Sequence, residues 1–123
     1  MIERRLEIRW ADIDAFRHVN NGAYLAYLEQ ARTAWLEEKL GAEAAWGFVL
    51  ARVEIDFRRE LTLEDGAVIA RCRLGEIGTS SVRTLEEVAT LDGGVAAEAS
   101  AVLVAVHDGL SRPLTEAERT ALA

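Results

Sequence analysis

This chain of 123 residues has few of the residue types on which covalently cross-linked, metal-bound or membrane-bound proteins depend. Its only cysteine, Cys72, cannot form an internal disulfide, which is typical of a cytoplasmic protein, and we expect this side chain to lie buried in a strand. The two histidines, His18 and His107, are far apart in the sequence, and neither has a cysteine or histidine partner at the spacing of a metal site. No apolar run approaches the roughly 18–20 residues that cross a bilayer, and no segment is typical of a signal peptide. We therefore expect no metal centre and no membrane association.

The charge balance excludes further functions. With a formal net charge of −7, the chain lacks the basic face that general nucleic-acid binding requires. It contains no Gly-x-Ser-x-Gly elbow and no Walker loop, so neither serine hydrolysis nor nucleotide hydrolysis has support. Lys39 is the only lysine, and the other basic residues are arginines, which can hold a phosphate group with two hydrogen bonds.

Length and hydropathy indicate a single domain over residues 1–123. Half of the residues are hydrophobic, which is enough for a core, although a domain of this size gains stability from oligomerisation. Alternating apolar residues predict a strand over residues 1–10, and helical spacing of apolar residues predicts a long helix over residues 21–40. Asn20 is the expected N-cap of this helix, and Gly41 is expected to end it.

Four further strands are expected at residues 48–59, 67–77, 80–90 and 95–107. The apolar residues of the first of these share parity and are predicted on one face: Val49, Ala51, Val53, Ile55 and Phe57. The strand at 95–107 is apolar on both faces, which is typical of a central strand. A short final helix is expected to begin at a capping box formed by Thr115 and Glu118. The three tryptophans are expected in the core or in an interface: Trp10, Trp35 and Trp46.

This order of elements predicts an α+β fold, in which a mainly antiparallel five-stranded sheet carries a long helix on one face. Between the first strand and that helix, the segment Asp12–Tyr24 concentrates two carboxylates, one imidazole and two amides. The first N–H groups of a helix lack intrahelical acceptors and lie at the positive end of the helix dipole. A carboxylate near such donors can attack a carbonyl, or activate water against it, while the donors stabilise the negative oxygen. The segment therefore indicates acyl chemistry, and Asp12 is expected to be a solvated or capping residue.

The pattern Asp14…His18-Val19-Asn20-Asn21-x-x-Tyr24 resembles the hotdog-fold acyl-CoA thioesterases, and it is most similar to their 4-hydroxybenzoyl-CoA thioesterase and YbgC-like branch. The likeness extends to the helix residues 24–32, to the turn at residues 78–81 and to the order of elements. The His-Val-Asn-Asn run also resembles the plant acyl-ACP thioesterases, although these have an asparagine where this chain has Phe16. The resemblance implies a hotdog fold, in which a strongly curved sheet wraps a central helix. It also implies homodimers that pair edge to edge, associate into homotetramers and hold the active site at the dimer interface.

The resemblance assigns roles to the residues that match the family motif. The catalytic carboxylate falls on Asp14, the oxyanion-binding backbone N–H on Asn21 and the tyrosine that lines the site on Tyr24. His18 matches a histidine that could orient Asp14 or contact the thioester or water. Asn20 either caps the helix or contacts the substrate.

Two groups of residues are further candidates for contacts with coenzyme A. Residues of the turn at 78–81 could hydrogen-bond the pantetheine arm or a phosphate, or only form the turn: Thr79, Ser80 and Ser81. Six arginines on strand-like segments could bind the phosphates, or only form polar strand faces: Arg52, Arg58, Arg59, Arg71, Arg73 and Arg83.

Together these residues predict a thioester hydrolase that cleaves acyl-CoA, or acyl-ACP, to a free acid and a thiol. It would need no metal and no other cofactor, because coenzyme A is part of the substrate. Asp14 could act as nucleophile or as general base, and both remain open. Three other hypotheses also remain open: a non-catalytic acyl-CoA-binding hotdog protein, a hotdog dehydratase or hydratase, and a purely structural domain. The sequence does not identify the acyl group.

Overall fold

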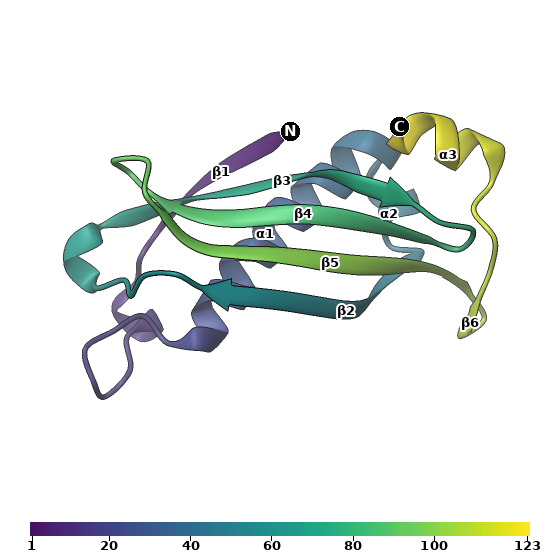
Figure 1. The fold of residues 1–123 in the computed structure, drawn as a ribbon. Helices are drawn as coiled ribbons and strands as arrows, with labels where there is room; N and C mark the ends of the chain where they lie inside the picture. Colours follow the sequence, from purple (N-terminus) through teal and green to yellow (C-terminus); the bar gives the residue numbers. More distant parts are fainter.

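The computed structural model describes residues 1–123 as a curved antiparallel sheet wrapped around a long helix, which lies behind the sheet in Figure 1. The predicted α+β class is thereby confirmed. The elements are β1 (Ile2–Glu7), η1 (Trp10–Asp12), α1 (Asn21–Leu40), α2 (Ala42–Ala45), β2 (Phe48–Phe57), η2 (Leu63–Asp65), β3 (Ala67–Ile77), β4 (Ser81–Thr90), β5 (Val95–His107), β6 (Leu110–Ser111) and α3 (Glu116–Leu122).

The sheet has the strand order β1-β3-β4-β5-β2, and every pairing in it is antiparallel. Strand β5 pairs on both sides, as its two apolar faces predict, whereas β1 and β2 are the edges. The expected count of five strands is corrected by β6, a two-residue strand that pairs with the end of β5. The unpaired edge of β2 is the longer of the two, and β2 ends on the side of the molecule where the segment with the site residues lies (Figure 1).

Helix α1 has the predicted bounds because both of its ends carry local signals. Oδ1 of Asn20 accepts a 2.8 Å hydrogen bond from the N–H of Ala23, which satisfies one of the free donors of the first turn. At the other end Gly41 has a φ of 88°, a backbone conformation that residues with a side chain rarely adopt.

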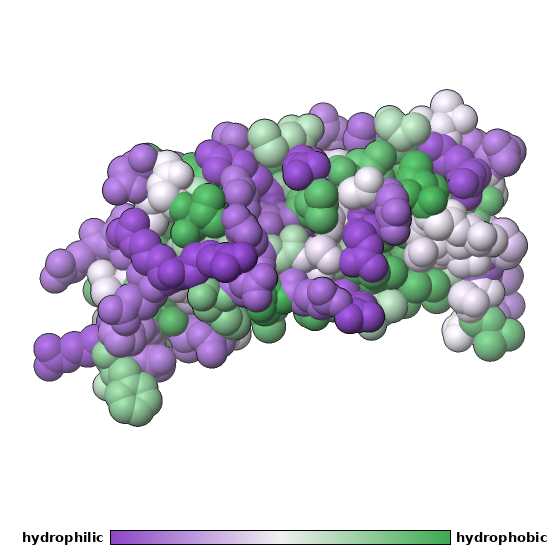
Figure 2. Space-filling model, viewed as in Figure 1, coloured by the Kyte–Doolittle hydropathy of each residue, from purple (hydrophilic) through white to green (hydrophobic).

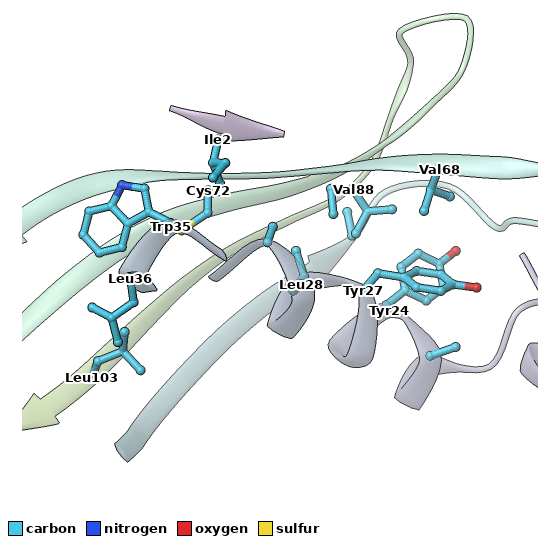
Figure 3. Packing of buried hydrophobic residues seen from close by; sticks show 14 of the residues in the cluster. Ile2, Tyr24, Tyr27, Leu28, Trp35, Leu36, Val68, Cys72, Val88 and Leu103 are labelled. Atoms are coloured by element: carbon cyan, nitrogen blue, oxygen red, sulfur yellow. The ribbon is translucent and has the colours of Figure 1, made fainter. Parts of the chain in front are cut away.

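The core lies between α1 and the concave face of the sheet. Leu28 and Trp35 of the helix are buried against β3 and β4, and Figure 3 shows Trp35 beside Cys72 and Leu36 beside Leu103. Cys72 has no exposed surface, as predicted for a small hydrophobic residue in a strand. Burial of these side chains fixes α1, and therefore fixes its first turn relative to the sheet.

Strand β2 contains a bulge that makes one sequence prediction wrong. Its pairing with β5 shifts by one residue between Leu50 and Arg52, so Ala51 is an extra residue on this strand. Because successive side chains in a strand alternate between faces, one extra residue reverses the parity. Phe48 and Leu50 therefore face α1 together with Val53, whereas Val49 and Ala51 do not share that face.

Two of the three tryptophans are not in the core of this chain. Trp35 is 2% exposed, but Trp10 is 83% exposed and Trp46 is 76% exposed. Trp10 misses the core because strand β1 ends at Glu7 and residues 10–12 form a 3-10 turn instead of continuing the strand. The final helix α3 does begin at the predicted capping box of Thr115 and Glu118.

The convex face of the sheet is covered by charged side chains. Arg71 of β3, for example, bonds Glu3 of β1 and Glu87 of β4. Figure 2 views the molecule from this side and shows hydrophilic side chains interspersed with smaller hydrophobic patches. No helix combines the length and the hydropathy that crossing a bilayer takes.

Candidate active site

The motif residues lie on a loop that is closed at its neck. Residues Ile13 and Val19 form an isolated antiparallel bridge, and the N–H of Asp14 donates to the carbonyl of His18 at 2.9 Å. Arg17 at the tip has a φ of 68°, which is uncommon for a residue other than glycine. The N–H of Val19 donates to the carbonyl of Leu61 at 2.7 Å, which ties the loop to the segment after β2.

Asp14 caps the turn of this loop with one of its two carboxylate oxygens. Oδ1 accepts hydrogen bonds from the N–H groups of Phe16 at 2.9 Å and His18 at 3.3 Å. Oδ2 accepts no hydrogen bond within the chain. The turn-capping interpretation and the catalytic one are therefore compatible, because one oxygen holds the carboxylate in place while the other is free for chemistry.

The start of α1 presents unused N–H donors beside this loop. Asn21 is the first helical residue, and its N–H donates no hydrogen bond within the chain. The preceding residue, Asn20, has its side chain occupied: Oδ1 caps the helix, and Nδ2 donates to the carbonyl of Asp12 at 2.9 Å. The structure thus confirms Asn20 as the cap and leaves the N–H of Asn21 available to an external acceptor.

Asp14, His18 and Asn21 line a cleft of about 330 Å³ between the motif loop, the start of α1 and the end of β2. Tyr24 also lines this cleft, and its hydroxyl group donates to the carbonyl of Arg59 at 2.8 Å. The Tyr24 ring meets Phe57 edge to face, with ring centroids 5.1 Å apart. Burial of this side chain raises the pKa of Tyr24, so its hydroxyl group remains a hydrogen-bond donor.

Another wall of the cleft is formed by the end of β2 and the residues after it. It contains Glu60, a charged residue that no sequence pattern predicted. His18 Nε2 lies 2.8 Å from Oε2 of Glu60, and both side chains are partly exposed. Arg58 and Arg59 also line this wall, and they are the only two of the six candidate arginines that do so. Glu60 lies 42 residues after His18 (60 − 18) in a segment without a motif, so no local pattern could identify it.

A buried network below the cleft holds the neck of the loop. Asp12 is 3% exposed, so it is a capping residue and not a solvated one. Its oxygens accept hydrogen bonds from the backbone and guanidinium group of Arg9 and from the hydroxyl group of Tyr27 at 2.8 Å. The Arg9 and Tyr27 hydrogen bonds lower the pKa of Asp12 despite its burial, so this carboxylate stays charged. The role of Tyr27 could have been predicted from the sequence, because this residue lies three positions after Tyr24 and therefore on the same face of the helix.

The turn at residues 78–81 lies at the opposite end of the sheet from the motif loop (Figure 1). The carbonyl groups of Thr79 and Ser80 bond Leu114 and Ala105, which places the turn beside β5 and the segment before α3. Within one chain, the structure therefore does not bring Thr79, Ser80 and Ser81 to the Asp14 cleft.

A larger hollow of about 420 Å³ lies on the convex face, where Arg71 and Arg73 line it together with several acidic residues. Arg71 is paired with Glu3 and Glu87, and these contacts raise the pKa of its guanidinium group. Unlike the smaller cleft, this hollow is lined by strand residues and by Met1, so no helix-start residue contributes to it. No three histidine, cysteine or acidic side chains converge as metal ligands.

Comparison with known proteins points to one family. Residues 8–117 match the family model of the thioesterase-like superfamily. The chain is 30% identical over 113 residues to the long-chain acyl-CoA thioesterase FadM of Escherichia coli strain K12, an alignment that covers 85% of this chain and 83% of that protein.

Solved structures agree with this match. A thioesterase from Thermus thermophilus, complexed with coenzyme A and Zn, superposes with a TM-score of 0.89 at 33% identity, covering 98% of this chain and 90% of that chain. The PA2801 protein of Pseudomonas aeruginosa superposes with a TM-score of 0.84 at 28% identity, covering 98% of this chain and 97% of that one. The predicted hotdog fold and its thioesterase kinship are confirmed, whereas the YbgC-like branch stays a prediction.

Proposed function

This chain belongs to the thioesterase-like superfamily, and we propose that it hydrolyses acyl-CoA thioesters to a free acid and coenzyme A, with Asp14 as the catalytic carboxylate. The observation that carries the proposal is that two groups without hydrogen-bond partners line the same cleft. They are Oδ2 of Asp14 and the N–H of Asn21 at the start of α1. This is the arrangement that acyl transfer needs, since charge moves onto the carbonyl oxygen as the thioester is attacked.

In the proposed mechanism the thioester carbonyl oxygen accepts a hydrogen bond from the N–H of Asn21. A preorganised donor of this kind lowers the barrier by about 3 kcal/mol. Oδ2 of Asp14 then either attacks the carbonyl carbon or removes a proton from an attacking water, while Oδ1 stays bonded to Phe16 and His18. In both versions water supplies the oxygen of the free acid, and the thiolate of coenzyme A leaves and is protonated.

His18 is proposed as a residue that contacts the substrate or the water, oriented by Glu60. Its ring nitrogen Nε2 is already 2.8 Å from Glu60, and both residues line the cleft together with Asn21. Tyr24 is proposed to line the site, and its bond to the carbonyl of Arg59 keeps the end of β2 in place.

Coenzyme A is proposed to enter past Arg58 and Arg59. Both guanidinium groups are about half exposed at the mouth of the cleft, where phosphate groups could reach them. Each is at present paired with a carboxylate, Arg58 with Glu98 and Arg59 with Asp65, so the phosphates would compete with these partners.

The active protein is proposed to be a homodimer joined along the free edge of β2, with dimers assembling into a homotetramer. An unpaired edge favours pairing with another strand, and Val49 and Phe57 on β2 are each more than 40% exposed. If two β2 strands pair antiparallel, the motif loop of one chain meets the opposite end of the other chain. Thr79, Ser80 and Ser81 of the partner subunit would then lie toward this chain's cleft. The one buried thiol, Cys72, suits a reducing compartment, and we place the protein in the cytoplasm.

A thiol-release assay over a panel of acyl-CoA and acyl-ACP substrates tests the proposal. We expect turnover of at least one acyl-CoA, and the ratio of kcat/KM values between the two carriers identifies the preferred one. Tight binding of acyl-CoA without release of thiol from any substrate would show a binding protein and refute the proposal. Light scattering measures the mass of the assembly in solution. The mass of a monomer would contradict the proposed homodimer and homotetramer.

A further inference from the structure

Two hollows follow α1 on the side that faces β2. The first, of about 230 Å³, begins at Gly22, immediately after the proposed oxyanion donor Asn21, and reaches Arg32. Its walls are mostly apolar: Leu25 and Ala26 of the helix face Leu50 and Val53 of the strand. Only Glu29 and Arg32, at the far end of the hollow, are charged.

The second hollow, of about 240 Å³, continues from that end. Most of its lining is apolar and comes from α1, from α2 and the residue after it, and from strands β2 and β5: Leu36, Ala45, Trp46, Phe48, Leu50 and Leu103. Thr33 and Glu37 of α1 also line it. Glu29 and Arg32 line both hollows, and so does Leu50. These two charged residues therefore lie where two mostly apolar hollows meet.

Arg32 is held at this divide by a buried ion pair. It is 6% exposed, and its Nε and Nη2 atoms each donate a 2.9 Å hydrogen bond to Glu86 of β4. Glu86 is fixed in turn by a 2.5 Å hydrogen bond from the hydroxyl group of Thr84. Nη1 of Arg32 has no hydrogen-bond partner in the chain. Since every fully buried side-chain nitrogen in this structure has such a partner, Nη1 must retain some contact with solvent.

We propose, on the premise that the chain hydrolyses acyl-CoA, that the first hollow binds the acyl chain and that the Arg32–Glu86 pair limits its length to about eight to ten carbons. Glu29 lies seven positions after Gly22, which corresponds to a rise of about 10 Å along the helix. An extended chain advances about 1.2 Å per bond, so eight or nine bonds cover this distance. The hollow opens at the residue that would hold the thioester carbonyl, which favours the substrate's own acyl chain over a second protein chain as its occupant.

The physical basis of the limit is a change in what each additional methylene contacts. Between Leu25 and Val53, a methylene leaves water for an apolar wall, which is worth about a fourfold gain in kcat/KM. Beyond that stretch, a longer chain must cover Nη1 of Arg32 and the carboxylate of Glu29, and these groups lose water without gaining a partner. The gain therefore stops, and affinity falls, at the charged divide.

The test is a series of straight-chain acyl-CoA substrates from C4 to C16, measured with the wild type and with the double variant R32M/E86L. Both partners are replaced together, because one alone would leave an uncompensated buried charge. In the wild type we expect kcat/KM to peak at C8–C10. In the variant the two hollows join, and the peak is expected to move to C12 or longer. The matched control R71M/E87L removes an Arg–Glu pair from the convex face and should keep the wild-type peak. A folded R32M/E86L variant with an unshifted peak overturns the proposal.

The variant A26F gives an independent test should the double variant not fold. Ala26 is an exposed helix position on the wall of the first hollow, so phenylalanine narrows that hollow without entering the core. We expect at least a tenfold loss of kcat/KM for C10-CoA relative to C4-CoA. An unchanged C10 to C4 ratio overturns the proposal, and a changed mass in light scattering would then show that a second copy covers the hollow. Release of thiol with a peak at C14–C16 in the wild type refutes the length limit alone. No release at any length refutes the proposed function, and the length limit with it.

Discussion

The hydroxyl group of Tyr27 donates a 2.8 Å hydrogen bond to Oδ2 of Asp12, and this contact joins the buried face of α1 to the neck of the loop that carries Asp14. Oδ2 also accepts from the N–H of Arg9, and the carbonyl group of Asp12 accepts from both nitrogens of Asn20. Asp12 thus links the end of β1, the cap of α1 and the helix interior. Burial and the Asp12 contact raise the pKa of Tyr27, so its hydroxyl group stays protonated.

Replacing Tyr27 with phenylalanine should loosen this neck while it preserves the packing of the ring. We expect a loss of about 1–2 kcal/mol in the free energy of unfolding, because a hydrogen bond to a charged, buried acceptor is removed. Urea unfolding measures this loss. Amide hydrogen exchange should accelerate at Asp14 and Val19 but not in α3, which serves as the internal control. An equal acceleration of exchange in the loop and in α3 would contradict a local role for this hydrogen bond.

Replacing Asp14 with asparagine should remove activity without disturbing the fold. The Oδ1 atom of asparagine can still accept the bonds from Phe16 and His18, so the loop keeps its turn. The amide cannot act as nucleophile or base, and we expect kcat to fall by about 10²-fold or more. Thiol-release kinetics, with circular dichroism and light scattering as controls, measure the effect. Wild-type turnover in this variant would exclude Asp14 from the mechanism.

The variant H18A should lose less activity than D14N. His18 contacts Glu60 at 2.8 Å, and no bond joins its imidazole to Asp14, so its removal leaves the carboxylate and the helix-start donor in place. We expect E60Q to have an effect of the same size or smaller, since Glu60 acts through His18. A loss in H18A as large as that in D14N would make His18 a direct catalytic partner.

The thiol of Cys72 should not react with a disulfide reagent in the folded protein. Burial, and secondarily the charge of Glu86, raises the pKa of Cys72 to about 12, so almost no thiolate is present at pH 8. One equivalent of thiol should appear when the chain is unfolded in urea. Rapid modification of the native protein would show that the core around β3 opens readily.

The bidentate pair of Glu118 with Arg112 should contribute stability that acid removes. This pairing, together with the capping of α3, lowers the pKa of Glu118 to about 2 from an ordinary value of 4.5. A carboxylate with a lowered pKa stabilises the fold fully above pH 4.5, and this stabilisation is lost as the pH falls toward 2. We expect E118Q to unfold about 2 kcal/mol more easily at pH 7. The difference from the wild type should shrink between pH 4.5 and pH 2 in urea titrations. A difference independent of pH would contradict an origin in charge.

Local signals account for what the sequence predicted well. Asn20 and Gly41 delimit α1, and Thr115 with Glu118 starts α3, because a cap is a contact between residues three or four positions apart. The Asp14 loop was likewise recognisable, because its motif is continuous in the chain.

Features that depend on distant contacts could not be predicted. The pairing of His18 with Glu60 exists only because the segment after β2 returns to the motif loop, and the pairing of Arg32 with Glu86 joins a helix to a strand 54 residues later. The exposure of Trp46 has the same origin, since α2 turns this side chain away from the core. A hydropathy pattern records the type of each residue and not the direction of its side chain.

The extra residue in β2 has a consequence for how this strand could change over time. Phe48 and Leu50 before the bulge, and Val53 after it, reach the helix side only because Ala51 resets the alternation between them. Loss of Ala51 would leave the composition of the strand almost untouched, yet it would exchange the inner and outer side chains of one half. Point substitutions along this strand are therefore far easier to accommodate than a single-codon deletion. In related sequences the residue types along β2 should vary, whereas the number of residues in the strand should stay constant.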